Sequence, residues 1–442
     1  MIWIIVKREI LDNLLSSRFA LATILCLVLV VLGAYVSIKD YEKRTKEYSE
    51  TVLAEKGREV FLYGTPKVYR KPEILGIISR GIERKLGNTA SHIDSISFGR
   101  TIFKNAIETE MVGTGVGDSA YLKLLEPIDF NFVVRVVISL LAIFLSYDAI
   151  SGEREAGVLK LMVSNPIPRA YILIAKFLAG IFCLCIPLTM SIIVAILMMQ
   201  LSDTIQFGTQ ELVRIGIVFL LSLLYLAGFY LLGLFISCHT KTSTMSLTIL
   251  LIIWISATVI MPNISTAYVK QFWRITPENE MQEQLARLSS EHGKKFMSAE
   301  NSDEQNRILK DMALALYRLN EKHRNEINHQ VEAAKWLSRL SPSSAFSFAV
   351  SAFSRTDIGT YKRLLESTRA YFLHIEMLYD IACKDSKRRL YEIGDKYDYT
   401  FKTSESIGGS FRDAIPDIVI LLLVATTFFM SAYASFVRYD VR

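Results

Sequence analysis

The sequence has few of the residues, and none of the motifs, on which enzyme and metal chemistry usually depends. Its 442 residues include only five cysteines and six histidines, at spacings that fit neither a disulfide nor a zinc site. It contains no glycine-rich phosphate loop ending in Lys-Ser or Lys-Thr, which excludes nucleotide binding of that kind. Ser-His-Asp signatures and the HExxH and CxxC motifs are also absent. We therefore expect a non-catalytic chain with no cofactor or metal of its own.

The sequence also lacks a strong imbalance of charge. Lys and Arg total 50 against 44 for Asp and Glu, which gives a net charge of +6. No basic block with interleaved aromatic residues occurs, so nucleic acid is not an expected partner. A small positive excess is instead typical of a protein that faces anionic lipid.

Apolar residues, in contrast, are abundant. Hydrophobic residues make up 51% of the chain and the mean hydropathy is +0.31, although 21% of the residues are charged. Six apolar stretches come close to or exceed the roughly 20 residues that a membrane helix needs. The predicted spans are residues 18–38, 129–147, 171–201, 213–238, 243–262 and 416–437. The expected fold is therefore an all-α membrane protein with six transmembrane helices and large polar parts.

The segments outside these spans differ in character. Residues 1–17 have apolar and charged residues on opposite sides of a helix, which predicts an amphipathic helix lying in the membrane interface. Residues 39–128 begin as a charged helix and include a glycine cluster at 113–117, interpreted as a flexible loop. In residues 263–413, apolar steps of three and four predict a hairpin of long helices with its turn near 298–303.

The distribution of basic residues predicts the orientation. Six spans place both termini and the loop at 148–170 on one side, where the short segments carry many Lys and Arg. The loop at 202–212 on the other side carries none, as the positive-inside rule predicts. Basic residues at 39–46 oppose this assignment, but long domains translocate largely regardless of charge. We expect both termini in the cytoplasm of a cell inner or plasma membrane, and segments 39–128 and 263–413 in the extracytoplasmic space.

The loop at 148–170 is the stretch on which a functional prediction depends. Ser151 is a possible N-cap, the carboxylates that follow it favour the first turn of a short amphipathic helix, and Asn165-Pro166 ends that helix. Its composition fits a surface on which a partner docks, and it fits a solvated connecting loop equally well.

The run SGEREAGVLK at 151–160, followed by Ser164-Asn165-Pro166, Arg169 and Lys176, resembles the cytoplasmic loop of ABC type-two permeases. It is most similar to the branch with the permeases for nitrous oxide reductase maturation and gliding motility. In that family the loop holds the coupling helix, which receives force from a separate ATPase subunit. The resemblance implies a type V ABC exporter-like fold, a second permease copy of the same or another chain, and an ATPase dimer that binds the ATP and Mg.

The resemblance also implies which residues of this loop contact the ATPase. Glu153, Arg154 and Glu155 are expected as polar contacts, Gly157 as a site of close approach and Leu159 as an apolar contact. The complete set of predicted coupling residues is Asp148, Ser151, Gly152, Glu153, Arg154, Glu155, Gly157 and Leu159.

Arg135 lies inside the second predicted span. A charge at mid-membrane costs about 2.5–3.5 kcal/mol on insertion scales, and less near the interface, which a long side chain can reach. Arg135 is therefore predicted either to extend to the lipid phosphates or to serve a translocation path or an interface.

Two functions from different classes fit these observations. The first is the permease subunit of an ABC exporter, coupled to its ATPase through residues 148–166. The second is a mechanotransmitting or assembly subunit whose outer segments act on an extracytoplasmic protein without moving a substrate. An ion-coupled carrier is disfavoured because the spans are nearly free of charge.

Overall fold

The computed structural model describes residues 2–56, 67–81, 89–92, 109–112, 128–159, 168–364, 366–367 and 406–438. Within this part of the chain, six helical segments are long and apolar enough to cross a membrane. They are Ser17–Glu50, Phe130–Glu155, Arg169–Gln200, Thr209–His239, Ser243–Phe272 and Ile407–Val437. The prediction of an all-α membrane protein with six transmembrane helices is confirmed.

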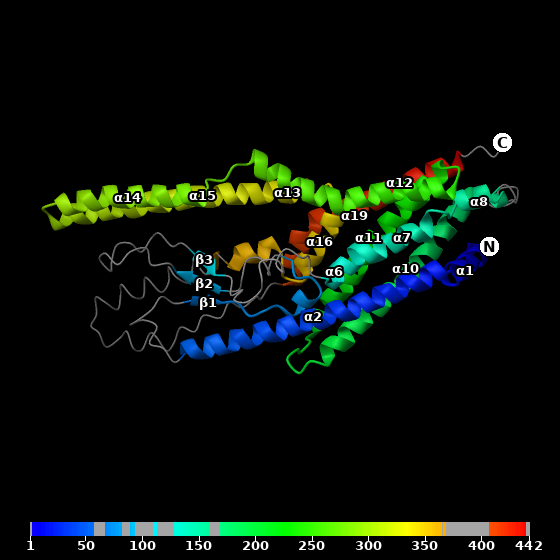
Figure 1. Ribbon diagram of the computed structural model, residues 1–442, viewed down its shortest axis with the longest axis horizontal. Helices are drawn as coiled ribbons and strands as arrows, with labels where there is room; N and C mark the ends of the chain where they lie inside the picture. Colours follow the sequence, from blue (N-terminus) through cyan, green and yellow to red (C-terminus); the bar gives the residue numbers. More distant parts are fainter. Residues whose placement is uncertain are drawn as a thin grey trace.

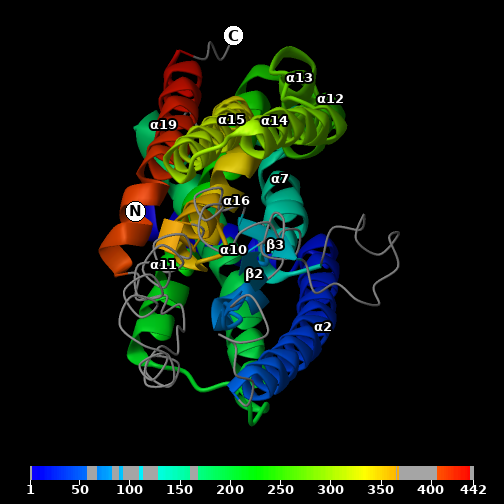
Figure 2. The same ribbon diagram turned by 90° about the vertical axis from the view of Figure 1, so that its left-hand side faces the viewer.

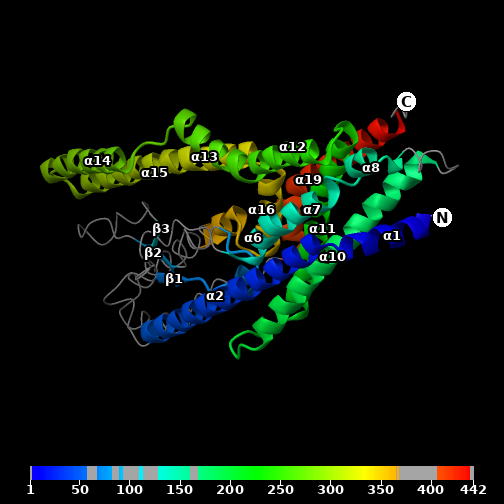
Figure 3. The same cartoon turned by 45° about the vertical axis from the view of Figure 1, so that its right-hand side comes forward.

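The molecule is elongated, and its two ends differ (Figure 1). One end carries α1 (Ile2–Leu14), α8 (Ser151–Glu155) and the last turn of α19 (Ile407–Val437), and we call it the terminal end. At the other end α14 (Glu278–Ser298) and α15 (Ser302–Ser338) project as a hairpin, and we call it the hairpin end (Figures 1 and 3).

The membrane helices lie between these ends, and several consist of consecutive helical pieces. The first span is part of α2 (Ser17–Lys56), and the second consists of α6 (Phe130–Phe132), the π-helix η2 (Val133–Ile138) and α7 (Ser139–Ser146). The third and fourth are α10 (Arg169–Gln200) and α11 (Thr209–His239). The fifth runs through α12 (Ser243–Ile255), the π-helix η3 (Ser256–Ile260) and α13 (Met261–Phe272), and the sixth is α19. Figure 2 shows these helices from the hairpin end.

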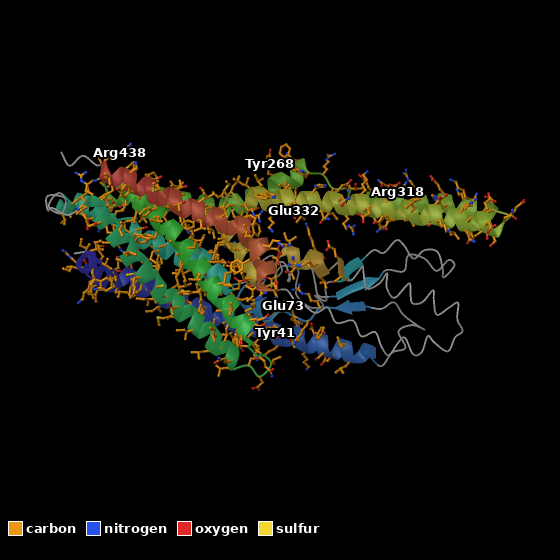
Figure 4. All side chains as sticks on the ribbon, turned by 180° about the vertical axis from the view of Figure 1, so that it is seen from behind. Tyr41, Glu73, Tyr268, Arg318, Glu332 and Arg438 are labelled. Carbon is orange, nitrogen blue, oxygen red and sulfur yellow. The ribbon has the colours of Figure 1, made fainter. Side chains whose placement is uncertain are left out.

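Helix α2 is longer than a bilayer is thick. Its 40 residues measure about 60 Å, roughly twice the thickness of the hydrocarbon core. Opposite charges one turn apart support its polar half, with Arg44 bonded to Asp40 at 2.9 Å. Tyr41, labelled in Figure 4, is 1% exposed because this half packs against the short 3₁₀ helix η1 (Ile74–Ile77).

A small antiparallel sheet accompanies the helices at the hairpin end. Strands β1 (Lys67–Tyr69), β2 (Thr89–His92) and β3 (Thr109–Val112) pair in that order, with Val68 opposite Ala90 and Ala90 opposite Met111. The glycine cluster predicted as a loop at 113–117 lies outside the described residues.

The hairpin packs along an apolar seam. Met312 and Leu316 of α15 are buried against Leu285 and Leu288 of α14, at the helical spacings that predicted this contact. The helices are joined at residues 299–301. Nearer the membrane, Glu326 accepts hydrogen bonds from the backbone nitrogen and hydroxyl of Thr276, and these bonds hold the pKa of its carboxyl below the ordinary value.

Three arginines, one of them at the base of the hairpin, bind to one face of α19. Arg339, at the end of α15, binds Asp417 through two bonds of 2.6 and 3.1 Å, and both side chains are buried. Arg363 lies 2.8 Å from Asp413, and Arg214 of α11 donates to the Ser410 hydroxyl at 2.8 Å. Arg214 also donates to the Phe353 carbonyl, where α16 (Pro342–Phe353) ends. Residues 410, 413 and 417 share a helix face, so the hairpin, α16 and α19 meet at one junction.

We expect Arg339→Ala to destabilise the protein by about 3 kcal/mol, because it leaves the Asp417 carboxylate buried without its cation. Arg318→Ala, at an exposed position on the hairpin (Figure 4), should stay within about 0.5 kcal/mol of the parent. Thermal unfolding in detergent measures both. Equal midpoints for the two variants would show that the Arg339–Asp417 pair does not hold the junction.

Candidate functional site

The loop between α7 and α10 folds back onto the terminal end of the bundle. Its described part, residues 147–159, contains a turn, the five-residue helix α8 and a second turn at Gly157. Gly157 has a φ of +72°, a left-handed conformation that favours glycine, and no atom lies within 4 Å of where a Cβ would stand. Gly157 therefore allows the chain to change direction directly after α8.

A buried lysine joins α8 to two other helices. The Lys176 ammonium, on α10, lies 2.7 Å from Oε1 of Glu153 on α8 and 2.7 Å from Oε1 of Glu9 on α1. The lysine side chain is 2% exposed and each carboxylate is 22% exposed. Because a buried ammonium without partners costs several kcal/mol, this contact holds the three helices together. We call these residues the Lys176 triad.

Two adjacent residues of α8 hold the turn between α11 and α12. Arg154 donates to the carbonyls of Thr240 and Cys238 at 2.7 and 2.8 Å. Glu155 Oε2 accepts from the backbone nitrogen of Ser243 at 3.1 Å. The positive charge of Arg154 therefore lies at the C-terminal end of α11, where carbonyl groups are free to accept. The negative charge of Glu155 lies at the N-terminal end of α12, so both charges interact favourably with the helix dipoles.

Ser237 of α11 fixes the backbone at the start of α8. Its hydroxyl accepts from the backbone nitrogens of Ile150 and Ser151 at 3.0 and 2.9 Å. Ser151 Oγ in turn donates to the Tyr147 carbonyl at 2.8 Å. Gly152 lies so close to α12 that an added Cβ would stand 3.4 Å from the Ser243 hydroxyl oxygen. A larger residue at 152 would therefore crowd this contact.

The first turn of α2 also contacts the loop. Arg18 hydrogen-bonds the Tyr147 hydroxyl and lies 3.3 Å from Asp148 Oδ2. Its guanidinium carbon is 5.4 Å from the centroid of the Tyr147 ring, within cation–π range. The ion pair is partly exposed and therefore contributes less than the Lys176 triad. Together these contacts bind the loop to α1, α2, α10, α11 and α12.

The comparison with protein families covers almost the whole chain. The family described as ABC-2 family transporter protein matches residues 3–441. The chain belongs to this family. No curated protein matches it. Membership indicates the non-catalytic, permease-type membrane subunit of an ABC transporter, in agreement with the six apolar helices.

The structure divides the predicted coupling residues of this ABC-2 protein into two groups. Glu153 and Arg154 bind within the chain, and Ser151 and Leu159 are buried, Leu159 being 2% exposed. Asp148 pairs with Arg18, and Gly152 packs beside α12. The exposed surface is formed by residues 155–158, of which Glu155 also binds Ser243.

Several residues that hold the loop were absent from the predicted set: Glu9, Arg18, Lys176 and Ser237. Lys176 was noted only as part of the family resemblance. One signal in the sequence could have found it, since it is the only Asp, Glu, Lys, Arg or His after Arg169 in the 32-residue α10. A charge in such a helix calls for a carboxylate partner, which Glu9 and Glu153 supply.

Arg135 of the ABC-2 protein lies in the π-helix η2. Its backbone carbonyl accepts from the hydroxyls of Tyr225 at 3.0 Å and Ser139 at 2.5 Å, and its side chain is partly buried. Trp254 of α12 donates to the same Ser139 hydroxyl at 2.9 Å. The described contacts therefore join the second, fourth and fifth spans here, and a role for the Arg135 charge in translocation stays a prediction.

We expect Lys176→Met to lower the free energy of unfolding by about 3 kcal/mol, because it leaves two carboxylates close together without their cation. Adding Glu9→Gln and Glu153→Gln should recover most of the loss. Lys241→Met, at an exposed lysine of the same end, is the control and should leave the thermal midpoint unchanged. A midpoint for Lys176→Met equal to that of the control would refute the stabilising role of the triad.

Proposed function

We propose that this ABC-2 protein is the permease subunit of an ATP-driven exporter, and that residues 148–166 couple it to a separate ATPase. The observation that carries the proposal is that the described part of this loop has one side bonded to the bundle and another side exposed. One side is bonded to five helices, and the other side, residues 155–158, is exposed. A segment built in this way can receive a displacement from a partner and pass it to the bundle.

The bonds of α8 define the route of that displacement. The Lys176 triad connects α8 to α1 and α10, so these elements move with the loop. Arg154 and Glu155 connect it to α11 and α12, which reach the hairpin end. The energy comes from ATP and Mg bound by the partner ATPase dimer. A second permease copy, identical or different, would complete the transporter.

The structure refines which residues we expect to meet the ATPase. Val158 is 41% exposed and apolar, and with Ala156 and Gly157 it forms a small protruding surface. Glu153 and Arg154 transmit force within the chain, whereas Val158 is the proposed apolar contact to the partner in place of Leu159.

We expect Val158→Asp to abolish the permease-dependent ATPase activity of the complex, because it places a charge in the proposed apolar contact while breaking no bond within the chain. The measurement is ATP hydrolysis by the ATPase that co-purifies with the tagged permease in lipid nanodiscs. Leu314→Asp, at a 47% exposed apolar position on the hairpin, is the matched control and should retain full activity. Unchanged activity in Val158→Asp, or no co-purifying ATPase, would contradict the proposal.

The proposed orientation has a separate test. With the native cysteines replaced, Asn301→Cys at the hairpin turn should react with an impermeant maleimide added outside intact cells. Lys241→Cys at the terminal end should react only after the membrane is permeabilised. The reverse pattern would place the hairpin in the cytoplasm and would exclude coupling of residues 155–158 to a cytoplasmic ATPase.

A second function is favoured by a specific feature of the hairpin end. The Arg339–Asp417 pair fastens the end of α15 to α19, so movement of α19 would be passed to α15, a helix about 55 Å long. In this alternative the protein transmits force to an extracytoplasmic partner without moving a substrate. Leu314→Asp would then impair the process in the cell while leaving ATP hydrolysis intact, whereas in an exporter neither should change.

A further inference from the structure

A cavity lies among the fourth, fifth and sixth spans. Its volume is about 280 Å³, close to the lower end of the range for small-molecule sites. Both α12 and α19 pack against α11, so α11 forms the floor while the other two helices form the walls. The lining residues are Leu224, Tyr225, Gly228, Phe229, Leu232, Ile253, Ala257, Leu340, Pro342, Leu421, Val424 and Phe428.

The lining has no charged side chain and is mostly apolar. Eleven of its residues have apolar side chains or none, and the twelfth, Tyr225, already donates its hydroxyl proton to the Arg135 carbonyl at 3.0 Å. A polar or charged ligand would lose its hydration here and gain few hydrogen bonds, and each polar group left without a partner costs several kcal/mol. The occupant must therefore be a hydrocarbon group.

The dimensions and position of the cavity identify that group more closely. The lining residues of α11 run from 224 to 232, a distance of about 12 Å along the helix. One leaflet of the hydrocarbon core is about 15 Å thick, half of the roughly 30 Å core. The lining residues 224–232 of α11, 253 and 257 of the fifth span and 421–428 of α19 lie near the middle of these spans, which acyl chains can reach from the lipid.

The surfaces beside the cavity face lipid. Ile252 and Ile255 on α12 are 62% and 44% exposed, and Leu422 and Leu423 on α19 are 47% and 60% exposed. Each of these four residues lies within two positions of a lining residue in the sequence. An apolar groove on such a surface opens into hydrocarbon, where association depends on close van der Waals packing.

We propose that this groove, which we call the acyl groove, binds one acyl chain of a membrane phospholipid near the middle of the spans. The chain lies along α11 between α12 and α19, and Leu340 and Pro342 close the groove at the hairpin end. Leu340 directly follows Arg339, so the bound chain packs beneath the junction that fastens the hairpin. The proposal does not depend on the coupling function of the loop at 148–166.

Gly228 gives a direct test. A Cβ built on it would meet Val424 Cγ1 at 3.7 Å, an ordinary contact, so the rest of a leucine would extend into the groove. Gly216 is the matched control, because it lies exposed on the same helix with no atom within 4 Å of an added Cβ. Both Gly→Leu changes also raise helix propensity by a similar amount.

The experiment uses the full chain in nanodiscs of phosphatidylcholine, a fraction of which carries a diazirine in one acyl chain. After illumination, labelling of peptides from α11 and α19 is measured by mass spectrometry, relative to the exposed Leu178 and Phe182 of α10. We expect enriched labelling at residues 224–232 and 421–428 in the parent. Gly228→Leu should reduce it at least fivefold, and Gly216→Leu should leave it unchanged.

Val424→Phe fills the groove from the opposite wall and should have the same effect, which keeps the test decisive if Gly228→Leu folds poorly. Labelling that persists in both filled variants would overturn the proposal. So would an equal loss in Gly216→Leu, or peptides of the groove cross-linked to a second copy of the chain in place of lipid.

Discussion

The terminal end of the protein depends on one ammonium group. Lys176 extends from an apolar membrane helix, and its charge is stable there only because Glu153 and Glu9 approach it to 2.7 Å. These carboxylates belong to α8 and α1, so satisfying a single buried charge fixes the positions of three helices. Arg154, Glu155 and Ser237 then join α8 to α11 and α12. As a result, the loop is bonded into the bundle as one of its structural elements.

The hairpin end is built on the same principle with arginines. Arg339, Arg363 and Arg214 bind three residues on one face of α19, two of them carboxylates. Between these ends the helices meet mostly through apolar side chains, with a few hydrogen bonds such as that from Trp254 to the Ser139 hydroxyl. The family match indicates the membrane subunit of an ABC transporter. Under the proposed function, the polar contacts at each end would pass a movement from the loop to the rest of the bundle.

The sequence predicted the parts of this structure that depend on local patterns. Six spans follow from the length of apolar stretches, and the hairpin from steps of three and four along residues 285–337. The contacts of the loop could not be predicted, because Lys176 is 23 residues from Glu153, and Thr240 is 86 residues from Arg154. For the same reason the local pattern does not predict that Leu159, an expected apolar contact to the ATPase, is buried within this chain. Nothing in the local composition marks the two π-helices or the short strands.

The central claim is that α1 and the loop form one rigid unit through the Lys176 triad. Spin labels at Leu11→Cys on α1 and Ala156→Cys on the loop, both exposed positions, report on this directly when the native cysteines are replaced. Double electron–electron resonance (DEER) in nanodiscs should give a single narrow distribution of the distance between the two labels. Lys176→Met should broaden this distribution. A distribution that is already broad in the parent, or one that Lys176→Met leaves unchanged, would contradict the account.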